Sequence, residues 1–390
     1  MVRTHVAVFN PVAFIGGAEI SLLETLRFLP DDIHVSLVLP GAGPLADAAR
    51  SLGAKIHELP VPSRLHTLGE RDKRSVFAKA LSAGPAIARV AWYLRQWVRS
   101  NRVDVLMTNG IKPHVLGGLS GPAAPMLWYL RESLENRPVG TAALAATSWR
   151  CSGVIAISRY VAGQLDRPLF ARVPKWVIYN PVDLSRFHPS TPPASDLQRA
   201  SQNVRYAVVG ALTPIKGQDL FLRAAKEVLK ENPDSHFYVI GDNPYATEQE
   251  SSYPGELRAL VRDLGIERSV FFLGHRQDAA AVIAAMDVIV QPNRGPEGLG
   301  RSVLEAMATA KAVVVVNRWG PGEVVRDDAT GLVFPHLDVV RLAEAMARVA
   351  DAGLRERLGL RARQWAELHV DAARNAEAVA VAMRTVASRA

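Results

Sequence analysis

The sequence of 390 residues has almost no cysteine, the residue that cross-links small secreted proteins and holds metal clusters. Its single cysteine, Cys151, excludes an intramolecular disulfide and a cysteine-based metal cluster, and fits a reducing compartment. No apolar run approaches the roughly 18 residues of a membrane-spanning helix. Residues 1–10 pass directly into a strand-like run, so we expect no signal peptide and a cytoplasmic protein.

Acidic residues are outnumbered by basic ones. The formal net charge is +8 and the pI is about 9.7, which favours anionic partners such as nucleotides, phospholipid headgroups or nucleic acid. The basic residues match no RNA- or DNA-binding motif, so we expect no nucleic-acid partner. The length favours two domains over a single core.

Short apolar runs alternate with helix-like stretches along nearly the whole chain. Runs that are apolar on both faces and separated by helices predict an α/β protein whose parallel sheets are covered on both sides. The strand candidates are residues 6–9, 35–39, 55–59, 103–108, 126–130, 153–157 and 176–179, then 206–209, 237–240, 270–273, 288–291, 313–316 and 332–334.

The strand candidates fall into two groups, which predict two Rossmann-like domains at 1–180 and 201–370. The intervening segment 181–200 is rich in proline and serine, which is typical of a linker. The tail 371–390 is alanine-rich and predicts a helix that packs back on the first domain.

A basic and aromatic stretch, 73–102, allows two interpretations. On an amphipathic helix such residues can dock on an anionic membrane surface. Alternatively, the helix buries its aromatic residues against the first sheet and exposes its arginines. We expect Gly84 and Pro85 to break the stretch into two helices. Its basic residues are Lys73, Arg74, Lys79, Arg89, Arg95, Arg99 and Arg102, and its aromatic residues are Phe77, Trp92, Tyr93 and Trp97.

The most informative stretch is the glycine-rich turn 295–300, which follows the apolar run 288–291 and opens a helix. Open α/β sheets bind ligands at such turns, because free N–H groups and the positive helix end point at the ligand. Glu297 lies in the turn, and Glu305 lies in about the second turn of the helix. An exposed Glu297 that merely suits the helix dipole is the structural alternative.

A second turn, 210–217, follows the first strand of the second domain. Lys216 would lie beside a helix start, where its ammonium can hold a diphosphate as a point charge. A solvated surface lysine is the alternative interpretation.

The first domain offers two weaker candidates. Gly16 and Gly17 open a helix after the first strand, and adjacent glycines let the backbone approach an anion closely. They form no G-x-G-x-x-G fingerprint, and a purely structural turn is the alternative. His114 is expected in a loop after the strand 103–108, placed to donate to a sugar hydroxyl or phosphate, or there incidentally.

Together these features resemble the retaining glycosyltransferases of GT-B family 4 along nearly the whole chain. The most specific part is 297–308, which looks like the E-x7-E motif of that family. The supporting segments are 16–19, 155–158, 178–187 and 312–333.

The resemblance implies two Rossmann-like domains with parallel sheets facing across a cleft, the second for a nucleotide sugar and the first for an acceptor. Glu305 would hold the ribose, and Glu297 would contact the donor sugar. Lys216 would neutralise the diphosphate, and His114 would lie near the reacting sugar. The segment 274–276 falls where the family has its base pocket.

Backbone groups complete the donor site that the resemblance implies. The N–H groups of Gly298, Leu299 and Gly300 would touch the sugar and the distal phosphate. Gly16 and Gly17 would close over the diphosphate from the first domain.

The chain departs from the family pattern at Ala211, where an arginine commonly follows the glycine that ends the first strand of the second domain. Either one diphosphate contact is missing, or another cation replaces this arginine: Arg294, Arg318 or, best placed within the motif, Arg301. There is also no D-x-D pair, with which GT-A enzymes hold a divalent metal. We therefore expect no metal and no cofactor, with Lys216 and helix dipoles stabilising the leaving group.

The implied reaction is a metal-independent, retaining transfer of a sugar from a UDP- or GDP-sugar to an acceptor hydroxyl. Front-face attack would make a phosphate oxygen the proton acceptor. The acceptor would be a glycan, a lipid-linked sugar or a small molecule, in polysaccharide, glycolipid or cell-envelope glycoconjugate synthesis. The membrane interpretation adds a peripheral location on the inner face of the cell membrane. The alternatives are a GT-B sugar-nucleotide epimerase and a non-catalytic nucleotide-sugar or glycan-binding protein, the latter motivated by Ala211.

Overall fold

A computed structural model describes residues 3–59, 61, 76–166, 168–171, 173–197, 203–242 and 252–389, with only the backbone for 76–83 and 169. Lys73 and Arg74 lie outside the described residues, as do the side chains of Phe77 and Lys79. The chain divides into two compact units: unit 1 is Met1–Pro181 with Ala372–Ala390, and unit 2 is Val182–Asp371.

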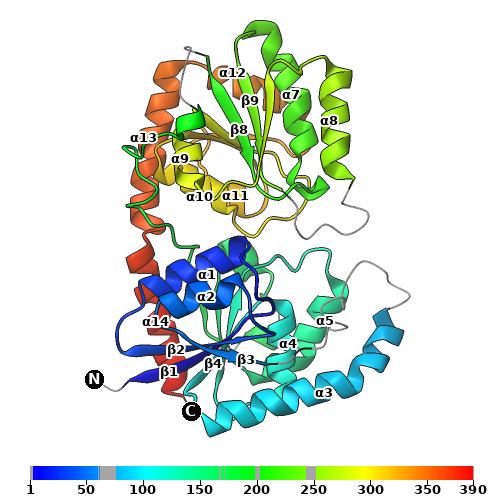
Figure 1. Ribbon diagram of the computed structural model, residues 1–390, viewed down its shortest axis with the longest axis vertical. Helices are drawn as coiled ribbons and strands as arrows, with labels where there is room; N and C mark the ends of the chain where they lie inside the picture. Colours follow the sequence, from blue (N-terminus) through cyan, green and yellow to red (C-terminus); the bar gives the residue numbers. More distant parts are fainter. Residues whose placement is uncertain are drawn as a thin grey trace. The chain divides into compact units, whose positions relative to one another are not determined.

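Unit 1 is built on a seven-stranded parallel sheet with the strand order β3-β2-β1-β4-β5-β6-β7 (Figure 1). Its central strands are buried on both faces, as β4 and β5 show over their whole length. The strands are β1 (Thr4–Phe9), β2 (Ile33–Leu39), β3 (Lys55–Glu58), β4 (Val105–Asn109), β5 (Met126–Leu130), β6 (Cys151–Ala156) and β7 (Lys175–Val177).

Helices cover both faces of this sheet. Because β-α-β crossovers are right-handed, the reversal of strand order at β1 puts α1 and α2 on one face and α3, α4 and α5 on the other. The helices are α1 (Gly17–Arg27), α2 (Pro44–Ser51), α3 (Val76–Ser100), α4 (Ile111–Ser120), α5 (Pro138–Thr147), α6 (Arg159–Gly163) and α14 (Ala372–Ala387).

Unit 2 has a six-stranded parallel sheet with the order β10-β9-β8-β11-β12-β13 (Figure 1). Helices α7, α8 and α12 pack on one face, and α9, α10 and α13 on the other. The strands are β8 (Arg205–Val209), β9 (His236–Ile240), β10 (Val270–Gly274), β11 (Val288–Gln291), β12 (Ala312–Val316) and β13 (Leu332–Phe334). The helices are α7 (Gln218–Glu231), α8 (Tyr253–Leu264), α9 (Ala279–Ala284), α10 (Arg301–Ala308), α11 (Trp319–Val324), α12 (Val339–Arg348) and α13 (Ala352–His369).

The predicted fold class is confirmed. All thirteen expected strands are present, each within two residues of the expected bounds at either end. The strands pair in parallel in both sheets. Short apolar runs predict the strands well in this chain because both faces of the sheets are covered, so nearly every residue of a central strand must be apolar.

The expected break at Gly84 and Pro85 is wrong, because α3 runs through both residues as one helix of 25 residues. Proline removes one backbone hydrogen bond from a helix interior. Downstream, Val90, Leu94 and Val98 are buried in the core of unit 1. This packing outweighs the local propensity, which predicts a break from the sequence alone.

The segment 181–200, expected to be a linker, lies within unit 2 from Val182 through its described part to residue 197. Val182 and Phe187 are buried. The Val182 N–H donates to the Val370 carbonyl at 2.8 Å, and Arg363 Nη1 of α13 donates to the Phe187 carbonyl at 2.9 Å. The prolines and serines of this segment leave no strand or helix pattern in the sequence. Its apolar residues Val182 and Phe187 nevertheless pack in unit 2.

The C-terminal helix α14 belongs to unit 1 and contacts α1 and several strands of the sheet. It buries Val379 and Met383. Arg384 forms an ion pair with Asp32 at 2.8 Å, which holds the pKa of that carboxyl below its usual value through a side-chain hydrogen bond. The chain therefore passes from unit 1 to unit 2 and ends in unit 1.

We expect Phe187→Ala to lower the free energy of unfolding of unit 2 by about 3–5 kcal/mol, because it leaves a cavity at a fully packed ring. Urea denaturation measures this loss. Val340→Ala is the control, since Val340 is 65% exposed. Equal stability of the two variants would mean that the proline-rich segment is only a tether.

Candidate functional site

The candidate donor site lies at the carboxyl edge of the unit 2 sheet, where the strand order reverses. β8 pairs with β9 on one side and with β11 on the other. The helices that follow β8 and β11, α7 and α10, therefore lie on opposite faces of the sheet. Ligands of open α/β sheets bind between the loops at such a point, which are here 210–217 and 292–300.

Backbone contacts fasten these two loops together. The N–H groups of Arg294 and Gly295 donate to the Ile215 carbonyl at 2.8 and 3.3 Å. Gly217 has φ +72°, and a Cβ there would lie 2.0 Å from the Pro292 carbonyl oxygen. Only glycine permits this approach, so the contact depends on residue 217.

The loop contact brings together Lys216 and Glu297, which lie 81 positions apart in the sequence. The Lys216 Nζ forms an ion pair with Glu297 Oε2, and the two side chains are 28% and 19% exposed. Asn293, fully buried, donates from Nδ2 to the same carboxylate oxygen at 3.4 Å. A cation and an anion are thus held at the place where the sequence predicts both.

The turn 298–300 is held against α10 on one side and α11 on the other. Gly300, with φ +82°, precedes α10 and has no side chain with which to cap its N–H groups. The Gly320 N–H of α11 donates to the Glu297 carbonyl at 3.0 Å. A Cβ at Gly320 would lie 2.2 Å from the Gly298 carbonyl oxygen. The turn therefore presents a rigid backbone at the positive end of the α10 dipole.

Glu305 lies in the second turn of α10, as expected, and is engaged by Arg301. Arg301 Nε is 2.7 Å from Glu305 Oε1, and the two side chains are only 12% and 10% exposed. Glu305 thus engages the charge of Arg301 in this structure, and compensation for Ala211 by Arg301 stays a prediction. Leu299, in the same stretch, is fully buried, so only its backbone can face a ligand.

The other two candidate cations differ from each other. Arg294 pairs with Asp219, at 2.9 Å from Nε to Oδ1, and this hydrogen bond raises the pKa of Arg294. Arg318 is exposed, lies 5.2 Å from the Trp319 ring centre and contacts His336 Nδ1 at 3.4 Å. Among the described carboxylates none pairs with Arg318, so this arginine has the least committed charge of the three.

The segment 274–276, expected at the base pocket, is partly structural. Arg276 donates to Asp278 from Nε at 2.8 Å and to Asp196 from Nη1 at 2.6 Å. These hydrogen bonds raise the pKa of Arg276 and lower the pKa of both carboxyls. His275 is exposed beside this clamp. A contact with a nucleotide base stays a prediction.

In unit 1 the glycine turn after β1 is the N-terminus of α1. Gly16 is the N-cap, and its N–H donates to Glu19 Oε2 at 3.2 Å. A Cβ at Gly17 would meet no other atom within 4 Å, so this side of the turn is open. An approach of this backbone to a diphosphate stays a prediction.

His114 lies in α4, not in a loop, because the helix begins directly after Gly110. The ring is fully buried, with Nδ1 2.6 Å from Thr108 Oγ1 and its plane stacked on Trp128. Burial lowers the pKa of His114 to about 3, so the ring is neutral at pH 7. Its Nε2 has no hydrogen-bond partner among the described residues. A role at the reacting sugar stays a prediction and requires that the ring become accessible.

A buried chain of polar residues, which the sequence analysis did not single out, follows the carboxyl edge of the unit 1 sheet. Asn109 Nδ2 donates to Asn10 Oδ1 at 2.6 Å, and Arg131 Nε donates to Asn109 Oδ1 at 2.6 Å. Arg131 Nη1 donates to Asn180 Oδ1 at 3.0 Å. A signal was available: three of these residues end or directly follow β1, β4 and β5, at the edge where parallel strands present ligand sites.

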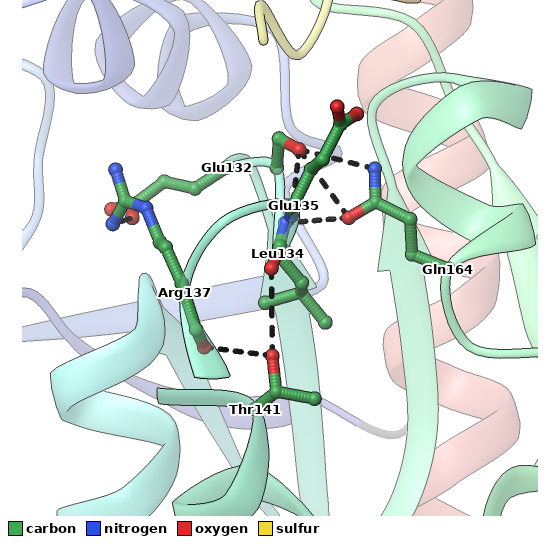
Figure 2. Close-up of polar contacts among 7 residues, drawn as sticks. Glu132, Leu134, Glu135, Arg137, Thr141 and Gln164 are labelled. Carbon is green, nitrogen blue, oxygen red and sulfur yellow. Dashed lines mark hydrogen bonds and ion pairs between the residues drawn. The ribbon is translucent and has the colours of Figure 1, made fainter. Parts of the chain in front are cut away.

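The loop after β5 continues this edge, and hydrogen bonds from Gln164, a residue outside the loop, fix its position (Figure 2). The Leu134 N–H donates to Gln164 Oε1, and Gln164 Nε2 donates to Ser133 Oγ at 3.2 Å. Glu132 and Arg137 form an ion pair at 2.5 Å. The loop thus has a defined shape and carries charged groups at the carboxyl edge of unit 1.

No cluster of three or more His, Cys, Asp or Glu side chains suited to a metal ion occurs in the part of the chain that the structure describes. Metal-independent catalysis stays a prediction. Cys151 is buried, and burial raises the pKa of its thiol to about 12.

Solved structures with the same architecture cover nearly the whole chain. HepE of Anabaena in complex with UDP and glucose has a TM-score of 0.79 and 21% identity, with 98% of this chain and 100% of that chain covered. A glycosyltransferase of Rickettsia africae has a TM-score of 0.80 and 16% identity, with 98% of each chain covered. Sucrose-phosphate synthase of Thermosynechococcus elongatus has a TM-score of 0.79 and 16% identity, and each chain is covered in full. These likenesses define a protein of the GT-B fold.

Family models identify both units. Residues 15–186 match Glycosyltransferase Family 4, and residues 204–352 match Glycosyl transferases group 1. The chain therefore belongs to the family 4, or group 1, glycosyltransferases.

Curated relatives match over shorter stretches. LpcC of Rhizobium leguminosarum bv. viciae, a lipopolysaccharide core biosynthesis mannosyltransferase, is 32% identical over 217 residues, which is 54% of this chain and 58% of that protein. The UDP-Gal:alpha-D-GlcNAc-diphosphoundecaprenol alpha-1,3-galactosyltransferase of Escherichia coli is 29% identical over 182 residues, 45% of each chain. The chain spans about half the length of the curated relatives it matches.

We expect Arg301→Ala to lower the free energy of unfolding by about 3 kcal/mol at neutral pH, because it leaves the buried Glu305 carboxylate unpaired. Without its partner the carboxyl should have a raised pKa in the folded state. The deficit should therefore shrink as the pH falls toward about 5, where the acid takes up a proton. Urea unfolding at both pH values measures this.

Two variants complete that experiment. Arg341→Ala, which breaks an exposed ion pair with Glu344, should cost little at either pH. Adding Glu305→Gln to Arg301→Ala should recover part of the loss. No recovery would show that the loss comes from the packing of the arginine stem.

We expect the ring signals of His114 to stay those of the neutral form between about pH 8 and pH 5, because the folded-state pKa is about 3. Since this pKa lies below that of the unfolded chain, about 6.5, its contribution to stability is present above about pH 6.5 and is lost as the pH falls toward 3. Histidine NMR across this range measures the titration. A His114 midpoint near 6.5 would mean that solvent reaches the ring.

Proposed function

We propose that the protein is a retaining glycosyltransferase that moves a sugar from a nucleoside-diphosphate sugar to an acceptor hydroxyl. The observation that supports this proposal most is that Lys216, Glu297 and the uncapped start of α10 converge at one sheet edge, with Glu305 in the second turn of α10. These groups are the ones that a diphosphate, a sugar and a ribose require. The family models for both units support the same class.

The ion pair between Lys216 and Glu297 suggests how the site accepts its donor. An ammonium and a carboxylate that neutralise each other can each exchange partners when a ligand arrives. Lys216 would turn to the diphosphate, and Glu297 would accept hydrogen bonds from sugar hydroxyls. Asn293 would keep Glu297 in place during the exchange, because its amide reaches the same carboxylate oxygen.

The main catalytic contribution in this proposal is stabilisation of the leaving nucleoside diphosphate. Lys216, the N–H groups of 298–300 and the α10 dipole would face the charge that develops on the distal phosphate. Glu297, already paired with a cation, would orient the sugar and stabilise its cationic transition state, not attack it. The acceptor hydroxyl would approach on the leaving-group side and transfer its proton to a phosphate oxygen. No metal is needed in this scheme.

Unit 1 would bind the acceptor along its carboxyl edge. The chain Asn10–Asn109–Arg131–Asn180 offers amide and guanidinium groups of the kind that bind sugar hydroxyls and phosphates, and the rigid loop after β5 adjoins it. Relatives named for lipopolysaccharide core and diphosphoundecaprenol substrates favour a glycan or lipid-linked acceptor in envelope glycoconjugate synthesis. We place the reaction in the cytoplasm.

One observation favours a second candidate, a non-catalytic nucleotide-sugar-binding protein. Ala211 stands where the family commonly has an arginine, and Arg294 and Arg301 are engaged by Asp219 and Glu305. A donor site short of one cation could bind without efficient transfer. Calorimetric donor binding, without transfer or hydrolysis across an acceptor panel, would favour this candidate.

We expect Lys216→Ala to reduce sugar transfer at least a hundredfold and Glu305→Ala to weaken nucleotide binding at least tenfold, since each loses a charge-assisted contact. A thermal-shift screen of UDP, GDP, ADP and their sugars identifies the donor first. Calorimetry and a transfer assay with that donor then compare the variants.

Lys230→Ala and Glu227→Ala are the matched controls, because these two residues form an exposed pair on the same unit. They should leave binding and transfer unchanged. Wild-type rates and affinities in both Lys216→Ala and Glu305→Ala would overturn the site assignment.

A further inference from the structure

The outer face of α3 carries a stripe of basic and aromatic side chains. Arg89, Trp92 and Arg99 follow one another at helical spacing, and all are exposed. Tyr93 and Arg95 flank them on either side of the same face. Trp92 is 56% and Tyr93 45% exposed, which is unusual for large aromatic rings in a chain with a well-filled core. We refer to these five residues as the α3 stripe.

The inner face of the same helix is fully used. Val90, Leu94 and Val98 are buried in the core of unit 1, and Trp97 stacks on His57 with ring centres 4.6 Å apart. α3 also packs along α4. The helix is therefore anchored without the α3 stripe, and packing within unit 1 does not account for the exposed rings.

The charge of the α3 stripe is not balanced locally. The sequence from 76 to 103 contains no aspartate or glutamate. Arg89, Arg95 and Arg99 form no ion pair with any residue that the structure describes. Other exposed arginines of the chain, such as Arg341 and Arg348, pair with nearby carboxylates. The stripe thus presents three uncompensated guanidinium groups around two rings.

We propose that the α3 stripe is a docking surface for an anionic phospholipid bilayer. Guanidinium groups bind lipid phosphates in bidentate geometry, and the amphipathic rings of Trp92 and Tyr93 suit the headgroup layer, with an apolar body and a polar tip. The contact is peripheral, since none of the helices that the structure describes is long and apolar enough to cross a bilayer. The stripe lies flat along one helix, which is the geometry of an interfacial helix.

The arrangement of the rings separates this partner from nucleic acid. Single-stranded nucleic acid stacks its bases on open aromatic faces. Here Trp92 and Tyr93 meet edge to face, with ring centres 5.0 Å apart and planes at 69°, so they form one wedge instead of two parallel platforms. A wedge ringed by arginines fits insertion between headgroups.

Vesicle flotation of the full chain tests the proposal, with phosphatidylcholine vesicles and with vesicles that also contain phosphatidylglycerol. We expect binding only to the anionic vesicles, with loss at high salt because the attraction is screened. Trp92→Ala/Tyr93→Ala and Arg89→Glu/Arg99→Glu should each weaken binding at least tenfold. The measurement uses no nucleotide or acceptor, so it does not depend on the proposed function.

Matched variants guard against effects of net charge and of misfolding. Arg268→Glu/Arg361→Glu makes the same charge change at two exposed arginines of unit 2 and should keep most vesicle binding. Trp149→Ala removes another exposed ring of unit 1, 73% exposed and outside the stripe, and should do likewise. The circular dichroism spectra and thermal unfolding midpoints of the α3 variants should match those of the wild-type chain.

Three results would overturn the proposal. The first is no flotation of the wild-type chain with anionic vesicles. The second is equal loss of binding in the α3 and unit 2 charge variants, which would reduce the effect to net charge. The third is binding of a single-stranded oligonucleotide that the α3 variants lose while vesicle binding persists, which would assign the stripe to nucleic acid.

Discussion

The candidate site of unit 2 depends on one close backbone contact, between Gly217 and the carbonyl of Pro292. It exists because β8 and β11 are neighbours in the sheet, although 78 residues, which include two more strands, separate the end of β8 from the start of β11. A side chain at 217 would push the two loops apart. With the contact in place, Lys216 and Glu297 meet, and the motif turn is pressed between α10 and α11. The site is thus a consequence of strand order and of one glycine.

Charge pairing is the second organising feature of this site. Glu297 and Glu305 each have a cationic partner, Lys216 for Glu297 and Arg301 for Glu305. The pairing offsets part of the cost of burying two carboxylates. The Lys216 pair is the more exposed of the two, with side chains 28% and 19% exposed, against 12% and 10% for the Arg301 pair. At the sheet edge of unit 1, the buried Arg131 instead donates hydrogen bonds to the side-chain amides of Asn109 and Asn180.

The two interpretations of the basic, aromatic stretch both describe part of α3. Val90, Leu94, Val98 and the stacked Trp97 pack on unit 1, as the structural alternative expects. Trp92 and Tyr93 remain exposed among arginines that form no ion pair with a described residue, as the membrane interpretation requires. A helix can serve both purposes because its two faces are independent at a period of 3.6 residues.

The sequence by itself determined the strands, the parallel α/β architecture and the family, because central parallel strands must be apolar on both faces and the motif Glu297–Ala308 is local. It also located Lys216 and Glu297 in the loops that follow two strands, and Glu305 in the helix after the second loop. Only the tertiary structure decided that Arg301 pairs with Glu305, that His114 is enclosed in α4, that α3 continues through Pro85 and that the expected linker packs in unit 2. Each of these depends on contacts between residues distant in the chain or on burial, and local pattern carries no information about which partner a charge or an apolar anchor finds.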